Sequence, residues 1–426
     1  MMELNHRENG DKLYQEGKFQ EAYEEYRKML QEGGKLTPHF NNRLLACARK
    51  SKKLDDLSHA FDLMTNISDE HFDLESNSVA DFKANNASTY LWLLYDLIKA
   101  DDFNVNLYLH EVLDYLDYCD DKNYRYLLAK ILFKNPNLNK KLFGEFLDRL
   151  DFKDYSKELK SQDGNTIASE YEQLGYGMAK YYAEVGEYSK AEEICADLLA
   201  LKEAKYKPFV INLQSEIALF QKDYTRAIEK KKQALEAKED WFLYHQLGLI
   251  YREMGEEAKA GKYFTFALLK NRQNLGYLNK LLVDLRTLYA GLGEGEAVKL
   301  LDSLLYYERK KNNWSVSEEL ENAEKIEITE ENFRKQYRTF RNLCKKILKE
   351  KLLAERKEGI VKSINPERRF GFLEERGGKS HHFSTNSLLD DIRDIALNDR
   401  VYFELTERFN PKKNIREQTC EYVIKI

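Results

Sequence analysis

The sequence contains very little proline, the residue that most often interrupts helices. Only five of its 426 residues are proline, whereas 28 are tyrosine. Charged residues make up 33% of the chain and hydrophobic residues 42%, a composition typical of a soluble, helix-rich protein with little linker. The length is sufficient for two or more domains, each with its own core.

Cysteine is also scarce, and its spacing argues against disulfide frameworks and metal sites. The five cysteines are Cys47, Cys119, Cys195, Cys344 and Cys420. They are scattered and odd in number, and no Cys–Cys or Cys–His pair has the spacing of metal ligands. We therefore expect reduced thiols and no bound metal.

The chain lacks long hydrophobic runs as well. Its most apolar stretch, residues 90–98, contains Asp96 and is far too short to span a bilayer. The first residues have no apolar segment of the length found in signal peptides. These features predict a cytoplasmic protein without a membrane segment.

Sequence patterns of catalysis are missing. We find no Ser–His–Asp, nucleophile-elbow, Walker or HExxH pattern, and nothing selects a pair among the many carboxylates. Residues 291–295 are rich in glycine, but they fall at a helix–turn–helix corner with no preceding strand, so a turn is expected there. We therefore expect that the protein is not an enzyme and that it has no catalytic residues and no cofactor.

The net charge of −5 is unevenly distributed. Residues 1–330 carry about −12 and residues 331–426 about +7. The acidity of the first part argues against nucleic acid as its ligand. The basic excess of the second part lies mostly in one short segment.

A pattern of small and large residues repeats through residues 166–325. Its clearest copy resembles a tetratricopeptide repeat at Tyr244, Leu247, Gly248, Tyr251, Gly255, Ala260, Phe264 and Ala267. Alanines recur in the same frame at Ala191, Ala227, Ala260 and Ala297. Their spacings of 36, 33 and 37 residues predict a solenoid of two-helix units.

Residues 1–34 hold a similar N-terminal repeat. It is marked by Gly10, Tyr14, Gly17, Phe19, Ala22 and Tyr26. Residues 35–165 keep helical periodicity without the small residues, and we interpret them as degenerate helical repeats, with a separate helical domain as the alternative. The resemblance implies a concave face that binds a protein partner or a second copy of the chain; a spacer is the alternative.

Residues 326–357 are predicted to form a basic connector helix. Thr329 can cap it, and apolar residues recur at helical spacing. Residues 331–357 hold ten Lys or Arg against three Glu. The expected phosphate contacts are Arg338, Arg341, Lys345 and Lys349. The alternative is a solvated face that balances the acidic repeats.

Residues 358–426 resemble a cold-shock domain, a five-stranded barrel of the oligonucleotide-binding class. The resemblance rests on residues 359–373, on His382-Phe383-Ser384 and on residues 397–403. The expected strands are residues 359–364, 370–374, 382–383, 400–406 and 419–425. The predicted fold is thus mainly α, an α-solenoid of helix–turn–helix repeats followed by a C-terminal five-stranded β-barrel of the OB type.

In cold-shock domains, two motifs on adjacent strands present aromatic rings to bases. In the first motif here, Phe370 and Phe372 alternate with Gly371, which would leave room for a base to lie flat. The second motif retains His382 and Phe383. The resemblance implies that the nucleic-acid-binding residues are Lys362, Arg368, Phe370, Phe372, His382 and Phe383.

The sequence departs from the family pattern at several of these positions. Ser363 and Ser380 replace a Trp and a Phe, and Arg369 replaces a Gly. The ring of His381 could compensate in part by stacking or hydrogen bonding. Residues 358–426 hold twelve basic and twelve acidic side chains, so we expect weaker binding than in a free-standing cold-shock protein.

Together these features predict a non-enzymatic adaptor. Its barrel is expected to bind single-stranded RNA or DNA, with RNA favoured, and its solenoid to bind a protein partner. The alternative is a pure protein–protein scaffold or regulator, for example in a stress or phage-defence system, whose cold-shock domain no longer binds nucleic acid.

Overall fold

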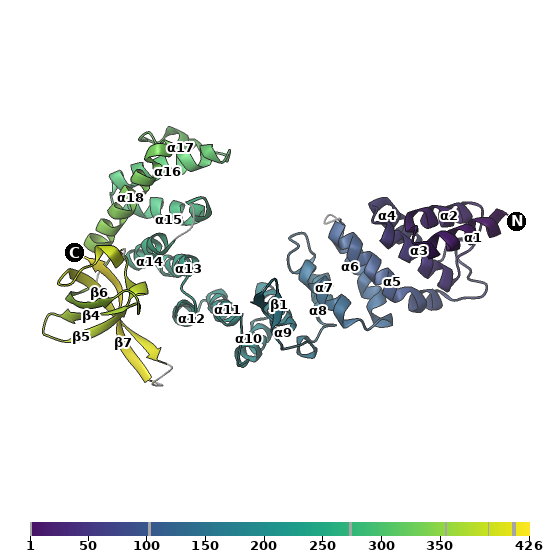
Figure 1. Ribbon diagram of the computed structural model, residues 1–426, viewed down its shortest axis with the longest axis horizontal. Helices are drawn as coiled ribbons and strands as arrows, with labels where there is room; N and C mark the ends of the chain where they lie inside the picture. The colour runs from purple at the N-terminus through teal and green to yellow at the C-terminus, as the bar shows by residue number, and fades with distance from the viewer. Residues whose placement is uncertain (1, 101–103, 272–274, 354–355, 391, 411–414) are drawn as a thin grey trace. The chain divides into compact units, whose positions relative to one another are not determined.

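The fold is described here from a computed structural model, which covers residues 2–100, 104–271, 275–353, 356–390, 392–410 and 415–426 (Figure 1). The chain forms two compact units, Met1–Tyr206 and Lys207–Ile426. The division falls inside the predicted repeat region 166–325, between two of its helix pairs.

Unit 1 is helical, with one short β-hairpin. Its helices are α1 (Met2–Gln15), α2 (Phe19–Gln31), α3 (Pro38–Ser51), α4 (Leu54–Thr65), α5 (Val79–Ala100), α6 (Val105–Tyr115), α7 (Lys122–Leu132), α8 (Lys140–Leu147), α9 (Glu170–Glu184) and α10 (Tyr188–Leu199). The hairpin pairs β1 (Lys160–Gln162) with β2 (Asn165–Ile167). It was not expected from the sequence, although its turn, Asp163-Gly164, has positive φ at both residues and is a common hairpin signal.

Unit 2 combines helices with a β-barrel. Its helices are α11 (Lys207–Phe220), α12 (Tyr224–Ala237), α13 (Trp241–Glu253), α14 (Glu257–Lys270), α15 (Asn279–Gly291), α16 (Gly295–Lys311), α17 (Glu318–Asn322) and α18 (Glu330–Ile347). Its strands are β3 (Lys357–Asn365), β4 (Phe370–Glu375), β5 (Ser380–Ser384), β6 (Arg400–Asn410) and β7 (Ile415–Lys425). The predicted fold class, mainly α with a C-terminal five-stranded barrel, is confirmed.

The repeat pattern corresponds to helix–turn–helix pairs. The frame alanines Ala191, Ala227, Ala260 and Ala297 are all fully buried, on α10, α12, α14 and α16. A Cβ on Gly248 would lie 2.5 Å from the Phe264 ring, so this glycine allows α13 and α14 to approach closely. The turn before α14 reverses at Gly255, whose φ of +76° favours glycine.

The connector helix α18 begins at Glu330, directly after the predicted cap Thr329. The Thr329 hydroxyl accepts a hydrogen bond from the Asn332 backbone N–H, and Asn332 completes the capping box. Phe340, Cys344 and Ile347 are buried against the other helices of unit 2. The helix continues as a π-helical turn, Leu348–Leu352, and Lys357 already belongs to β3, so the connector is shorter than the predicted 326–357.

The barrel is closed in the strand order β3-β4-β5-β7-β6. Neighbours are antiparallel except β5 and β7, which pair in parallel at Phe383 and Cys420. Because β7 lies between β5 and β6, the connection from β5 to β6 crosses one end of the barrel, as in Greek-key barrels. Each of the five predicted strands overlaps one of the strands β3 to β7, although β6 and β7 extend further than predicted. The predicted turn between β6 and β7, residues 410–414, lies mostly outside the described residues.

A bulge in β7 turns one side chain away from the barrel. Two β7 residues, Tyr422 and Val423, lie opposite the single residue Phe403 of β6. Tyr422 adopts φ of +56°, a left-handed conformation that is unusual for a bulky residue. Val423 fills the barrel core, whereas Tyr422 and Ile424 belong to the core of the helices.

Tyr422 joins the barrel to the helices. Its ring stacks on Phe266 of α14, with centroids 4.0 Å apart and planes at 13°. The ring contacts Tyr244 and Tyr263 edge-on. Such aromatic contacts add about 0.5–1.5 kcal/mol each beyond area burial. The barrel therefore contributes Leu389, Tyr422 and Ile424 to the core of the helices of unit 2.

Ion pairs at the edges of this contact fix its orientation. Lys262 of α14 bonds both carboxylate oxygens of Glu404 on β6, at 2.8 and 2.7 Å. Lys345 of α18 bonds Asp390 at 2.6 Å. All four side chains are less than a fifth exposed, so removing one partner would leave a largely buried charge.

Among the residues that the structure describes, no helix is both long and apolar enough to cross a membrane.

Replacing Tyr422 should separate the barrel from the helices. We expect Tyr422→Ala to lower the free energy of unfolding of unit 2 by about 3–5 kcal/mol, because it removes the stack on Phe266 and leaves a cavity. Tyr422→Phe keeps the ring and is the matched control. Urea denaturation of both variants measures the difference; equal stability would show that the ring does not hold the barrel.

Candidate nucleic-acid interface

Three aromatic side chains gather on the outer face of the barrel. Phe370 and Phe372 project from β4 and His382 from β5. The ring centroids lie 5.9 Å apart for Phe370–Phe372, 5.8 Å for Phe370–His382 and 5.6 Å for Phe372–His382. Phe372 is 39% exposed although it is a large apolar residue. We call these three residues the aromatic face.

Strand alternation places these rings together. Along β4, Gly371 and Leu373 point inward, so Phe370 and Phe372 point outward. Phe372 lies opposite His382 on β5 and opposite Ser363 on β3. Ser363, Phe372 and His382 therefore form one row of side chains across β3, β4 and β5. In this row β3 contributes a hydroxyl group and no aromatic ring.

The imidazole of His382 offers a flat surface at neutral pH. Partial burial lowers its pKa below the ordinary histidine value, and the nearby Glu417 opposes this shift. The ring is therefore mostly uncharged at pH 7. It lies at 27° to the ring of Phe370, so both rings present similar orientations.

The two predicted phosphate contacts of the barrel are exposed. Lys362 lies on β3 and has an ion pair with Glu374, with Nζ and Oε2 3.6 Å apart. Arg368 lies in the β3–β4 turn, where its backbone N–H donates to the Asn365 side chain. An exposed ion pair of this length contributes little, so Lys362 remains accessible to a phosphate.

Phe383 is a core residue, which corrects its prediction as a binding residue. Its side chain is fully buried in the barrel. The alternation of β5 requires this, because His382 and Phe383 face opposite ways. Only His382 of that pair can reach a ligand.

Gly371 and His381 also differ from their expected roles. A Cβ on Gly371 would lie 2.4 Å from the ring of Phe383 and 2.6 Å from the Ser363 carbonyl, so this glycine makes room for the core and not for a base. His381 is buried and its Nε2 lies 3.0 Å from a Glu375 oxygen. It therefore cannot compensate for the missing aromatic at Ser380.

The connector residues divide into two groups. Arg341 donates to the carbonyls of Leu268 and Leu269 at the end of α14. Lys345 pairs with Asp390, and Lys349 donates to the Lys425 carbonyl. The other group is Arg338 alone, whose exposed guanidinium has no acidic partner among the described residues. Of the four predicted phosphate contacts, three are thus engaged within the fold, Arg341 with α14 and Lys345 and Lys349 with the barrel.

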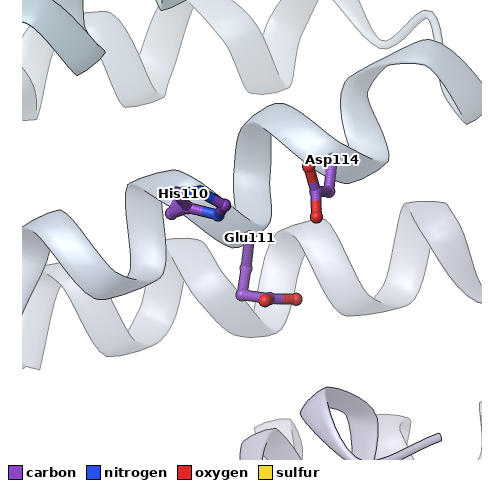
Figure 2. Close-up of side chains that lie close together, drawn as sticks. All are labelled: His110, Glu111 and Asp114. Atoms are coloured by element: carbon purple, nitrogen blue, oxygen red, sulfur yellow. The ribbon is translucent and has the colours of Figure 1, made fainter.

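A cluster with metal-ligand chemistry lies on α6 in unit 1. His110, Glu111 and Asp114 place their ligand atoms within 4.8 Å of one another, all from one helix (Figure 2). The cluster was not predicted from the sequence. His110 and Asp114 are exposed, and burial raises the pKa of Glu111, which disfavours the anionic form that a metal requires. Such surface groups are common, and we infer no metal site.

Gly371→Ala tests the close packing beneath the aromatic face. Its Cβ would collide with Phe383, so we expect unit 2 to lose about 1–3 kcal/mol of stability. Gly291→Ala is the control, because its Cβ meets nothing within 4 Å. Chemical denaturation compares the stabilities of the two variants. If Gly371→Ala were as stable as the unmodified protein, the barrel core would have room for the added methyl group.

No family model matches the sequence, and no curated protein matches it significantly. Among solved structures, the chain is similar to a monomeric IFIT1 mutant with m7Gppp-AAAA, at 14% identity over 79% of each chain and a TM-score of 0.28. It is also similar to the P58(IPK) TPR domain, at 14% identity over 81% of this chain and 99% of that one, with a TM-score of 0.22. At these scores neither structure indicates a function for this chain.

Proposed function

We propose that this protein is a non-enzymatic adaptor that binds single-stranded nucleic acid, RNA in preference to DNA, on the aromatic face of its barrel. The observation that carries the proposal is the cluster of Phe370, Phe372 and His382 on two adjacent strands, in which Phe372 and His382 are exposed and Phe370 is half-buried. The resemblance of residues 358–426 to a cold-shock domain supports the same reading. Unpaired bases stack on such rings with little sequence preference.

The size of the face sets the expected affinity. Base–aromatic stacking contributes about 1–3 kcal/mol per base. Three rings in mutual contact leave room for only a few stacked bases, and the serines at positions 363 and 380 add none. The barrel has equal numbers of acidic and basic side chains, so phosphate attraction must come from individual residues such as Lys362 and Arg368.

The helical repeats would supply the second half of an adaptor. The acidic charge of residues 1–330 disfavours nucleic acid and is compatible with a protein ligand. Stacked helix pairs present broad surfaces for such contacts. We propose a protein partner or a second copy of the chain on this surface.

One observation favours a second function, a protein scaffold without nucleic-acid binding. Ser363 completes the row with Phe372 and His382, where the cold-shock pattern has a Trp. Loss of that ring and of the ring at Ser380 is expected in a barrel that no longer binds bases. The two functions differ in whether oligonucleotides bind at all.

Removing the rings tests the proposal directly. We expect Phe370→Ala/Phe372→Ala to weaken binding of a labelled single-stranded RNA by at least about tenfold, because one lost stacking contact of 1.4 kcal/mol has that effect. Fluorescence anisotropy at two salt concentrations measures the change in full-length protein.

Phe372→Tyr is the matched control, because it keeps the exposed ring and should keep the affinity. Circular dichroism and thermal unfolding of each variant exclude a folding defect. Failure of the unmodified protein to bind RNA or DNA at low salt would favour the scaffold function. Binding that survives the double substitution would exclude the aromatic face as the binding site.

A further inference from the structure

An open groove has a volume of about 1680 Å³. It is bordered by α18, by the loop between α12 and α13, by the C-terminal end of α14 and by one end of the barrel. Eight of its lining side chains are cationic and four are acidic. The barrel taken alone has no such excess. Aromatic side chains, Trp241 and Tyr337, also line it.

Part of this positive charge is unengaged. Arg341, Lys345 and Lys349 line the groove, but their head groups hold the barrel and α14 in place. Arg334 and Arg338 lie one turn apart on α18, line the same groove and are exposed. Within the described ranges, neither guanidinium forms an ion pair with an acidic side chain.

The acidic groups of the groove are mostly occupied. Asp390 pairs with Lys345 and also accepts the backbone N–H of Lys425. Glu239 pairs with Lys270 at 3.0 Å. Asp240 caps α13 by accepting from Phe242. These pairings reduce the repulsion that the carboxylates would exert on an anionic ligand.

The groove and the aromatic face share a border. Arg369 lines the groove and immediately precedes Phe370, the first residue of β4. Thr385 lines it from the other side, directly after the end of β5, and its backbone N–H donates to the Arg369 carbonyl at 3.0 Å. A chain that leaves Phe370 therefore meets Arg369 at the entrance of the groove.

Arg369 is held in an unfavourable backbone conformation at this entrance. Its φ is +57°, in the left-handed region that costs a non-glycine residue about 1 kcal/mol or more. Its side chain is exposed. Glycine would be the relaxed choice here, so an arginine adds charge at the entrance at the expense of stability.

We propose that the groove takes the phosphodiester backbone of the same single strand whose bases stack on the aromatic face, with Arg369, Arg334 and Arg338 as its phosphate contacts. This inference rests on the proposed function and extends it to a composite site of barrel and connector helix. The strand runs from Phe372 and His382 past Phe370, over Arg369, and along α18. Because the site is longer than the barrel, its affinity depends on oligonucleotide length.

Length dependence distinguishes the two parts of the site. We compare single-stranded oligouridylates of about four and about twelve nucleotides, a range that single OB-type barrels and their extensions cover. Arg334→Ala/Arg338→Ala should weaken the longer oligonucleotide by about fivefold per lost phosphate contact near 0.1 M salt. It should reduce the slope of log K against log salt by about 1.4. Binding of the shorter one should be unchanged.

Two further variants separate charge and folding from contact. Lys335→Ala/Lys346→Ala removes the same amount of positive charge from exposed positions of α18 that do not line the groove. This variant should change the affinity for the shorter and for the longer oligonucleotide by no more than about twofold. Arg369→Gly should weaken the longer oligonucleotide while the melting temperature stays equal or rises, because glycine relieves the strained φ.

The outcomes are distinguishable from failure of the proposed function. Equal effects of the groove and control variants, or no effect of either, would overturn the groove path while leaving base stacking intact. No binding of either oligonucleotide to the unmodified protein would overturn both proposals. Binding of inorganic polyphosphate as tightly as the longer oligonucleotide, with no effect of Phe372→Ala, would show a polyanion site unconnected to the aromatic face.

Discussion

The stacking of Tyr422 on Phe266 is the contact on which the organisation of unit 2 depends. A barrel of about seventy residues tethered only by its connector would reorient freely. The β7 bulge turns Tyr422 out of the barrel wall, and the ion pair between Lys262 and Glu404 fixes the angle of approach. One end of the barrel is thereby held beside α18. The groove exists only because this docking is maintained.

Two residues of the barrel with strained backbone lie at its borders. Tyr422 lies at the contact with the helices, and Arg369 lies at the entrance of the groove. Tyr422 and Arg369 are both non-glycine residues with positive φ, and each conformation costs free energy that the rest of the fold must offset. At Tyr422 the gain is visible as aromatic packing in a shared core. At Arg369 no structural contact of the side chain offsets the cost among the described residues. A ligand that binds the guanidinium is the explanation that we propose.

Periodicity and spacing predicted the helix pairs, the capping of the connector by Thr329 and the barrel strands, because each depends on residues that are near one another in the sequence. The roles of Phe383 and Gly371 were predicted wrongly, because a family motif does not say which alternate residues of a strand enter the core. The barrel–helix contact was not predicted at all. Its signal was present in Tyr422-Val-Ile424, which is apolar on both faces of a strand, but its partner Phe266 is distant in sequence. Likewise, nothing local indicated that Lys345 serves the fold while Arg338 stays unengaged.

The most direct test of the central claim, that barrel and connector form one nucleic-acid site, is site-specific photo-crosslinking. A single-stranded RNA of about twelve nucleotides carries one 4-thiouridine, moved from one end to the other, and mass spectrometry locates each crosslink in the full-length protein. The account predicts crosslinks to Phe372 or His382 from labels near one end and to the α18 segment around Tyr337 from labels near the other. Crosslinks that do not move with the label, or that fall in the helices of unit 1, would contradict it.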